Sequence, residues 1–183
     1  MRELSLHIID IVENSIQADA TLIKITIKED KNNDLLLIKI IDNGRGISKE
    51  KINDVRDPFE TSRRTRRVGL GLSLLEAATS RCGGQLTIKS REKICTIITA
   101  TFKYSHIDRA PIGNVAESIM SIIMSLKEES HIVYKHYYNF KKFCLDTREI
   151  KKILGEEISL NQLEVVNWIG QYVEEGLLNI MEV

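Results

Sequence analysis

Asp42 stands where an apolar run ends and two closely spaced glycines begin, in the segment DNGRGI. The run from Leu35 to Ile41 predicts a buried strand, so the Asp42 carboxylate lies at the end of that strand. Gly44 and Gly46 permit positive φ angles and let the backbone approach a flat ligand closely. The segment therefore predicts a ligand-binding loop, and the plainer alternative is an aspartate that only caps a turn.

A second glycine pair, Gly69 and Gly71 in VGLGLS, opens an apolar segment that is predicted to be a helix from Leu70 to about Arg81. A glycine turn that leads into a helix presents backbone N–H groups and the positive end of the helix dipole to phosphate. Guanidinium groups also match phosphate oxygens. Four of them crowd the segment before the turn, at Arg63, Arg64, Arg66 and Arg67. Together the two glycine segments predict a nucleotide held by its base at one end and its phosphates at the other.

The arginine cluster has two other interpretations. It is a solvated basic loop if none of its side chains reaches a phosphate, and for any single arginine this is the plainer interpretation. Nucleic-acid binding is less favoured, because the cluster is short and lacks interleaved aromatic residues.

Composition narrows the class of protein. The chain has 183 residues, 43% hydrophobic and 28% charged, with Lys+Arg and Asp+Glu both at 26. This balance gives no global charge that would attract nucleic acid or an anionic membrane. Cys82, Cys95 and Cys144 form no metal-binding pattern and suit a reducing compartment. With no signal peptide and no membrane-length apolar run, we expect a cytoplasmic protein.

The apolar periodicity of the first half predicts an α+β fold. Helical or alternating patterns indicate helices over 3–18 and 70–81 and strands over 23–27, 35–42, 85–91 and 94–103. Adjacent strand pairs joined by short turns favour a mixed, mostly antiparallel sheet with helices on one face, a two-layer sandwich.

The pattern lapses after Tyr104, where Pro111 and Gly113 act as breakers. We therefore predict two domains, 1–105 and 106–183, the second being a small α+β accessory unit. Within it the sequence indicates a helix over 112–126, strands over 131–138 and 141–146, a helix that begins after Asp146 and a final helix over 163–177.

The helix predicted over 3–18 has one polar face. His7, Asp10, Asn14 and Gln17 lie three or four residues apart and are therefore stacked above one another. The plain interpretation is an exposed helix face.

Taken in order, these segments resemble the ATP-binding (Bergerat) fold shared by gyrase, the large heat-shock chaperones, histidine kinases and mismatch-repair ATPases. The resemblance covers about residues 1–103. ENSIQADAT, at 13–21, is most similar to the mismatch-repair helix. DPFETSRRTRRVGLGLSLLEAATSRCGGQLTIKS, at 57–90, is most similar to the histidine-kinase lid and the helix behind it.

This resemblance implies ATP and Mg²⁺ as cofactors. Asp42 would accept a hydrogen bond from the adenine amine, and Asn14 would coordinate Mg²⁺. The residues implied beside the base are Gly44, Gly46, Ile47 and, with its hydroxyl, Thr96. The residues implied around the phosphates are Gly69, Leu70, Gly71, Leu72, Arg63 and Arg64.

Two residues depart from the family pattern. The hydrolytic members carry a glutamate one helical turn before the asparagine, where this chain has the shorter Asp10. Asp10 is the candidate general base, acting through a water molecule. Val68 stands where the kinases usually have a threonine. His7 is interpreted as a surface or site-lining histidine and not as a phosphate acceptor. Packing also explains the histidines at 106, 131 and 136.

Three functions stay open. The first is a Mg-ATP-binding regulatory protein that acts on or with a partner protein, like a detached histidine-kinase catalytic domain or an anti-sigma kinase. The second is a mismatch-repair-like ATPase in which lid closure makes or breaks a dimer. The third is a non-catalytic ATP sensor whose residues 106–183 bind the partner or form a homodimer.

Overall fold

The computed structural model describes residues 3–48, 70–155 and 157–182. Its centre is one six-stranded sheet with the strand order β3-β4-β2-β1-β5-β6. Only β1 and β5 pair in parallel, and the other four neighbouring pairs are antiparallel. The strands are β1 (Leu22–Asp30), β2 (Leu35–Asp42), β3 (Leu86–Arg91), β4 (Cys95–Lys103), β5 (His131–Tyr138) and β6 (Lys141–Asp146). The predicted mixed, mostly antiparallel sheet is confirmed.

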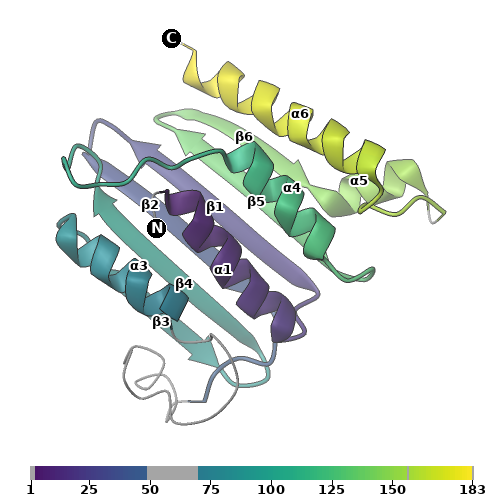
Figure 1. Cartoon of the computed structure of the whole chain (residues 1–183), viewed down its shortest axis with the longest axis horizontal. Coiled ribbons are helices and arrows are strands. Elements are labelled where there is room, and N and C mark those ends of the chain that lie inside the picture. The colour runs from purple at the N-terminus through teal and green to yellow at the C-terminus, as the bar shows by residue number, and fades with distance from the viewer. Residues whose placement is uncertain (1–2, 49–69, 156, 183) are drawn as a thin grey trace.

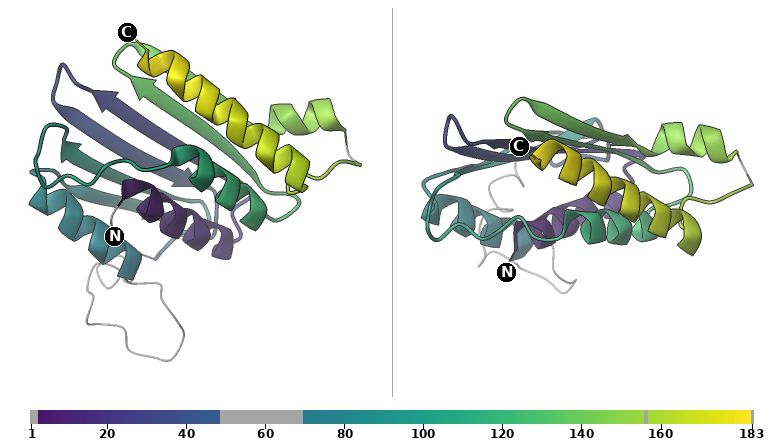
Figure 2. Two further views of the ribbon diagram at one scale, coloured as in Figure 1. Left: turned by 45° about the horizontal axis from the view of Figure 1, so that its top comes forward. Right: turned by 90° about the horizontal axis from the view of Figure 1, so that it is seen from above.

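Four helices pack in one layer against one face of this sheet (Figures 1 and 2). A fifth, α5, continues beyond the end of β6. The helices are α1 (Leu4–Gln17), α3 (Leu70–Arg81), α4 (Val115–Ser125), α5 (Thr147–Leu154) and α6 (Leu163–Met181). The two-layer α+β sandwich predicted from the periodicity is therefore confirmed. None of the helices in the described ranges combines the length and apolar surface that a bilayer crossing needs.

The core lies between the helix layer and the sheet. Alternate residues of β1, such as Ile23, Ile25 and Ile27, are at most 1% exposed. They meet the apolar stripe of α1, where Ile8 and Ile11 are also buried. Period-two burial in a strand opposite period-3.6 burial in a helix is the arrangement that the sequence pattern indicates.

Residues 106–183 do not form a separate sheet. β5 pairs with β1 along eight residues, from Leu22 opposite His131 to Glu29 opposite Tyr138. The C-terminal strands therefore extend the sheet of the N-terminal half, and the predicted division at 105/106 falls within one continuous sheet. Local periodicity could not reveal this pairing, because it joins strands about a hundred residues apart in sequence.

A buried polar chain ties the two halves together. His136 Nε2 lies 2.9 Å from Glu29 Oε1, and Tyr134 Oη lies 2.5 Å from His136 Nδ1. Tyr104 Oη donates to the second Glu29 oxygen at 3.1 Å. The polar side-chain atoms of these four residues are all paired, so burying them leaves none of them without a partner. His136 is thus a core histidine, as packing predicted.

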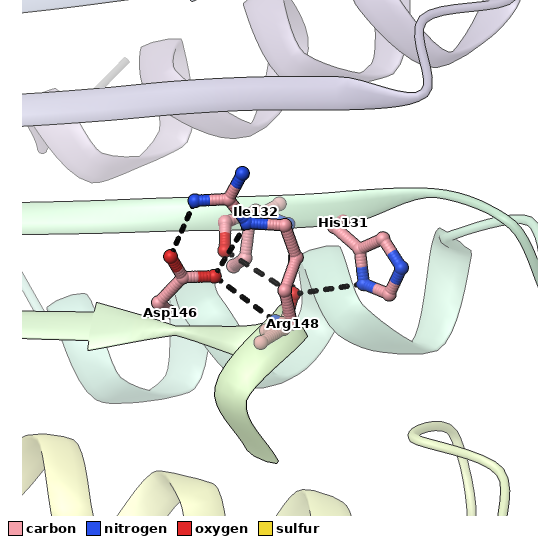
Figure 3. A network of polar contacts seen from close by, with 5 residues as sticks. His131, Ile132, Asp146 and Arg148 are labelled. Carbon is pink, nitrogen blue, oxygen red and sulfur yellow. Dashed lines mark hydrogen bonds and ion pairs between the residues drawn. The ribbon is translucent and has the colours of Figure 1, made fainter. Parts of the chain in front are cut away.

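The β6–α5 junction is fixed by its own polar contacts (Figure 3). Asp146 caps α5 by accepting a bond from Arg148 N at 3.0 Å, and its carboxylate also pairs with the Arg148 guanidinium. The Thr147 hydroxyl bonds to the backbone of Ile132. The predicted helix start after Asp146 is confirmed, although the capping contact runs to Arg148 and not to Glu149.

Candidate nucleotide-binding site

A cavity of about 180 Å³ opens between α1, the loop after β2 and the start of β4. Six of its lining residues belong to the predicted site: Asn14, Asp42, Gly46, Ile47, Leu72 and Thr96. The other six were not predicted to belong to it: Ile11, Ser15, Gln17, Ala18, Arg45 and Ile98. With Leu72 of α3, four segments distant in sequence thus meet around one hollow.

Asp42 is the buried acid of this cavity, with 4% of its surface exposed. Its Oδ2 accepts a hydrogen bond from Ser15 Oγ at 2.9 Å, and its Oδ1 accepts one from Gly44 N at 3.0 Å. Asp42 therefore does cap the turn, and it also lines the cavity. Because an ionised carboxylate has about four acceptor positions, it keeps capacity for a donor from a ligand.

The loop after Asp42 is held by backbone contacts. Asn43 accepts bonds from two backbone N–H groups at the start of β1, and Arg45 N donates to Ala18 O at 2.9 Å. Gly46 has a φ of 65°, and a Cβ atom there would lie 2.3 Å from Arg91 O. Only glycine fits this position, which explains the second glycine of DNGRGI.

Thr96 lies directly opposite Asp42 in the sheet, with 6% of its surface exposed. Its Oγ1 is 3.1 Å from Ser90 Oγ, which accepts a bond from Ile47 N and donates to Cys95 O. Because Ser90 donates its one hydroxyl proton to Cys95 O, it can only accept from Thr96, so Thr96 Oγ1 is the donor in that pair. Thr96 lines the cavity, and its hydroxyl oxygen keeps capacity to accept a bond from a ligand.

Asp10 and Gly71 meet at the end of the site where α3 begins. A Cβ atom on Gly71 would lie 3.3 Å from Asp10 Oδ2, so the acid packs closely on the first turn of α3. Burial raises the pKa of Asp10 above its ordinary value. The structure thus places the candidate base beside the helix start that the sequence assigns to phosphate.

His7 is not a surface histidine, which was one of its two predicted positions, but its bond to the Gly71 backbone keeps it beside the predicted site. It is 4% exposed, and its Nδ1 has no hydrogen-bond partner in the described part of the chain. Burial lowers its pKa, and a bond to the Gly71 backbone acts in the opposite direction. The position is turned inward because α3 packs against α1, a contact that helical periodicity alone does not show.

Several predicted site residues lie outside the described residues: Arg63, Arg64 and Gly69, together with Val68. Leu70 begins α3, and Leu72 is 5% exposed on the cavity wall. Arg45, which was not predicted to belong to the site, lines the cavity, and its Nη2 donates to Gln17 O at 2.8 Å.

Asn14 is suited to act as a magnesium ligand. It lines the cavity, and its side-chain amide bonds to none of the residues described. No group of three His, Cys, Asp or Glu side chains gathers at a metal-binding distance within residues 3–48, 70–155 and 157–182. A donor set of one amide oxygen fits Mg²⁺ held mainly by phosphate and water, and does not fit a protein-only metal cage.

Ser15 is the unpredicted cavity residue that contacts the Asp42 carboxylate. It occupies the apolar stripe of α1, one turn after Ile11, where a hydrophobic residue is expected. A serine in such a stripe is a signal of a buried polar contact, and Asp42 is that contact.

A second hollow of about 340 Å³ lies between α5 and α6. It is lined by Ile150, Ile153, Leu154, Glu164, Val165 and Trp168. None of the predicted site residues is among them, and its lining is almost wholly apolar.

Comparison with known proteins assigns the family. Residues 2–106 match the model of the histidine kinase-, DNA gyrase B- and HSP90-like ATPases. This chain belongs to that family. It carries an ATP-binding domain of the histidine-kinase-like type, and the predicted resemblance is confirmed.

Among curated proteins, sporulation kinase D of Bacillus subtilis (strain 168) is 31% identical over 98 residues. The match covers 54% of this chain and 19% of that kinase, so the chain spans less than a fifth of its relative's length.

Among solved structures, the N-terminal domain of a DNA repair protein superposes with a TM-score of 0.53 at 18% identity. The match covers 85% of this chain and 57% of that chain. It shows a shared fold that reaches beyond the segment of the family match. The catalytic domain of histidine kinase ThkA, nucleotide-free, has a TM-score of 0.44 at 24% identity, over 57% of this chain and 68% of that chain.

Proposed function

We propose that this chain is a Mg-ATP-binding regulatory protein that acts on or with a partner protein, in the manner of a detached histidine-kinase catalytic domain or an anti-sigma kinase. The observation that carries the proposal is the Asp42 carboxylate, fixed by Ser15 and Gly44 in the wall of a cavity of about 180 Å³. Membership of the ATPase family and the similarity to a kinase support it. Three unpaired cysteines support a reducing, cytoplasmic setting.

In the proposed complex Asp42 selects adenine. Its free acceptor capacity is directed to the exocyclic amine of the base, which adenine has and guanine replaces with a carbonyl oxygen. A carboxylate next to that carbonyl is repelled, so the site prefers adenine. The apolar cavity residues Ile11, Leu72 and Ile98 are placed to contact the faces of the ring.

The triphosphate is proposed to lie toward the start of α3. Backbone N–H groups in the first turn of that helix and its dipole favour the negative charge. Asn14 would hold Mg²⁺, which neutralises phosphate charge when bound. Asp10 stands nearby and, with a pKa raised by burial, is suited to accept a proton from a water molecule.

Phosphotransfer tests the regulatory proposal. The chain is incubated with γ-labelled Mg-ATP and with candidate partner proteins from its source, and label is followed on protein. Label that appears on one partner and is lost with the Asn14→Ala variant supports a kinase. Tight nucleotide binding without label transfer, but with altered partner binding, would instead mark an ATP sensor.

A second candidate function is ATP hydrolysis coupled to lid closure or dimerisation. The close packing of Asp10 on Gly71 favours it, because it puts a carboxylate at the phosphate end. If Asp10 is the base, Asp10→Asn abolishes phosphate release while Asp10→Glu, which restores the family residue, retains or raises it. Equal release by the wild type and Asp10→Asn removes this candidate.

A further inference from the structure

The sheet has one face that no described helix covers. All four helices of the second layer lie on the opposite side, as the view from above in Figure 2 shows. All six strands are described, so the side chains of the open face can be read from the pairing registers.

Four lysines surround one threonine on this face. Lys24 and Lys28 lie two residues before and after Thr26 on β1. Lys39 on β2 and Lys135 on β5 are its direct cross-strand partners. Neighbours of both kinds lie within about 7 Å along or across a sheet. We call these four residues the lysine cross.

The positive charge of the lysine cross is largely uncompensated. Lys28 pairs with Asp30 at 2.9 Å, whereas Lys24, Lys39 and Lys135 form no ion pair with any described residue. Among the described strand residues, the open face bears only two acids, Asp30 and Asp146, and Asp146 is bonded to Arg148.

Four more basic residues lie on the face, at Lys89, Arg91, Lys103 and Lys142, although Lys103 pairs with Asp34 at 3.8 Å. Because the whole chain carries equal numbers of basic and acidic residues, this face is a local concentration of charge.

The chemistry between the lysines favours a protein ligand. Partly exposed Leu37 and Ile41 flank Lys39 along β2. Among the described strands, Tyr137 supplies the one phenol ring on the face, so there is no row of rings on which nucleic-acid bases could stack. The cross contains no arginine, the residue whose planar fork matches phosphate. Ammonium groups beside aliphatic side chains instead complement carboxylates on an amphipathic segment.

We propose that the lysine cross is the docking surface for an acidic, amphipathic segment of a partner protein. None of its residues lines the nucleotide cavity, so this surface is separate from the ATP site. Positive potential on a flat face speeds encounter with an acidic partner and fixes its orientation.

The probe is a short glutamate-rich amphipathic peptide, with the same peptide carrying Gln for every Glu as its control. Binding is measured by fluorescence anisotropy at low and physiological salt with the full chain. The test variant is Lys24→Gln/Lys39→Gln/Lys135→Gln. The matched control, Lys127→Gln/Lys141→Gln/Lys152→Gln, removes the same charge from exposed positions outside the open face.

The glutamate peptide is expected to bind the wild type and the control variant. Its affinity for the test variant should be about tenfold lower, because three surface charge pairs together contribute roughly that much to binding. Physiological salt should weaken binding. ATP binding and the urea midpoint, measured in parallel, should show that the test variant is folded with an intact nucleotide site.

Equal peptide affinity for the wild type and the test variant overturns the proposal, as does an equal loss in the control variant. Single-stranded DNA, duplex DNA and phosphatidylserine vesicles are measured as well. Tighter binding of any of these, with the same dependence on the lysine cross, shows that the acidic-protein assignment is wrong.

Discussion

Ser15 Oγ lies 2.9 Å from Asp42 Oδ2, so a side chain of α1 orients the carboxylate at the end of β2. The two residues are 27 positions apart in the sequence, and both are buried. The bond makes the position of α1 part of the geometry of the adenine pocket. Helix and acid are therefore expected to act together when a nucleotide binds.

Ser15→Ala should weaken ATP binding about fivefold and cost about 1 kcal/mol of unfolding free energy, the usual worth of one buried hydrogen bond. Calorimetric titration and urea unfolding measure the two effects. Ser15 Oγ also lies 3.2 Å from the Ile11 carbonyl oxygen, four residues earlier in its helix. Ser125→Ala is the matched control, because Ser125 bonds the carbonyl of Ser121 in the same way but is exposed. Equal ATP affinity for Ser15→Ala and the wild type would show that Asp42 needs no such support.

Gly46→Ala should destabilise the chain by at least about 2 kcal/mol and abolish ATP binding, because its φ is positive and the new Cβ would meet Arg91 O at 2.3 Å. Gly155→Ala is the control. Gly155 also has a positive φ, but a Cβ there meets no atom within 4 Å, so this variant loses only backbone strain, about 1–3 kcal/mol, without the added clash. Similar midpoints for the two variants in urea unfolding would contradict the crowding at Gly46.

Asp10→Asn should stabilise the chain at neutral pH. Burial raises the folded-state pKa of Asp10 above 3.8, so the folded chain holds this proton more tightly than the unfolded chain does. Wild-type stability therefore falls as pH rises from 3.8 through the folded pKa. The amide of the variant cannot ionise, so its gain should be present above that interval and absent below 3.8.

Urea unfolding on both sides of this interval measures the Asp10 effect, with Asp108→Asn as the control at a side chain that is 61% exposed. A gain that is the same at both pH values would trace to packing and not to ionisation. A gain in stability of Asp10→Asn at neutral pH would mean that the ionised Asp10 carboxylate destabilises the wild type. Such a cost is expected of a group that serves the function of the site.

Much of the fold was predictable because its signals are local. The bounds of α3 and β2 agree with those predicted, since an apolar periodicity ends at glycines in one case and at Asp42 in the other. Gly83 and Gly84 end α3 by donating to Ser80 O and Thr79 O, as a glycine C-cap requires.

The relations between distant elements were not predictable. The parallel pairing of β5 with β1 has no local signature, so residues 106–183 were expected to form a separate unit. The inward position of His7 and the Ser15–Asp42 bond likewise depend on how α1 packs. In the candidate site, motifs alone predicted that Asn14, Asp42 and Thr96 belong to the site. That the three residues line one cavity could be seen only once the sheet and α1 were in place.

The account rests on Asp42 as the adenine-selecting acid, and calorimetric titration of Mg-ATP into the wild type and Asp42→Asn tests it most directly. Asp108→Asn is the control for loss of one acid. We expect binding by the wild type and the control, and a loss of about tenfold to a hundredfold for Asp42→Asn, as for a charge-assisted hydrogen bond. Wild-type protein that gives no heat with Mg-ATP, or Asp42→Asn that binds it unchanged, would contradict the account.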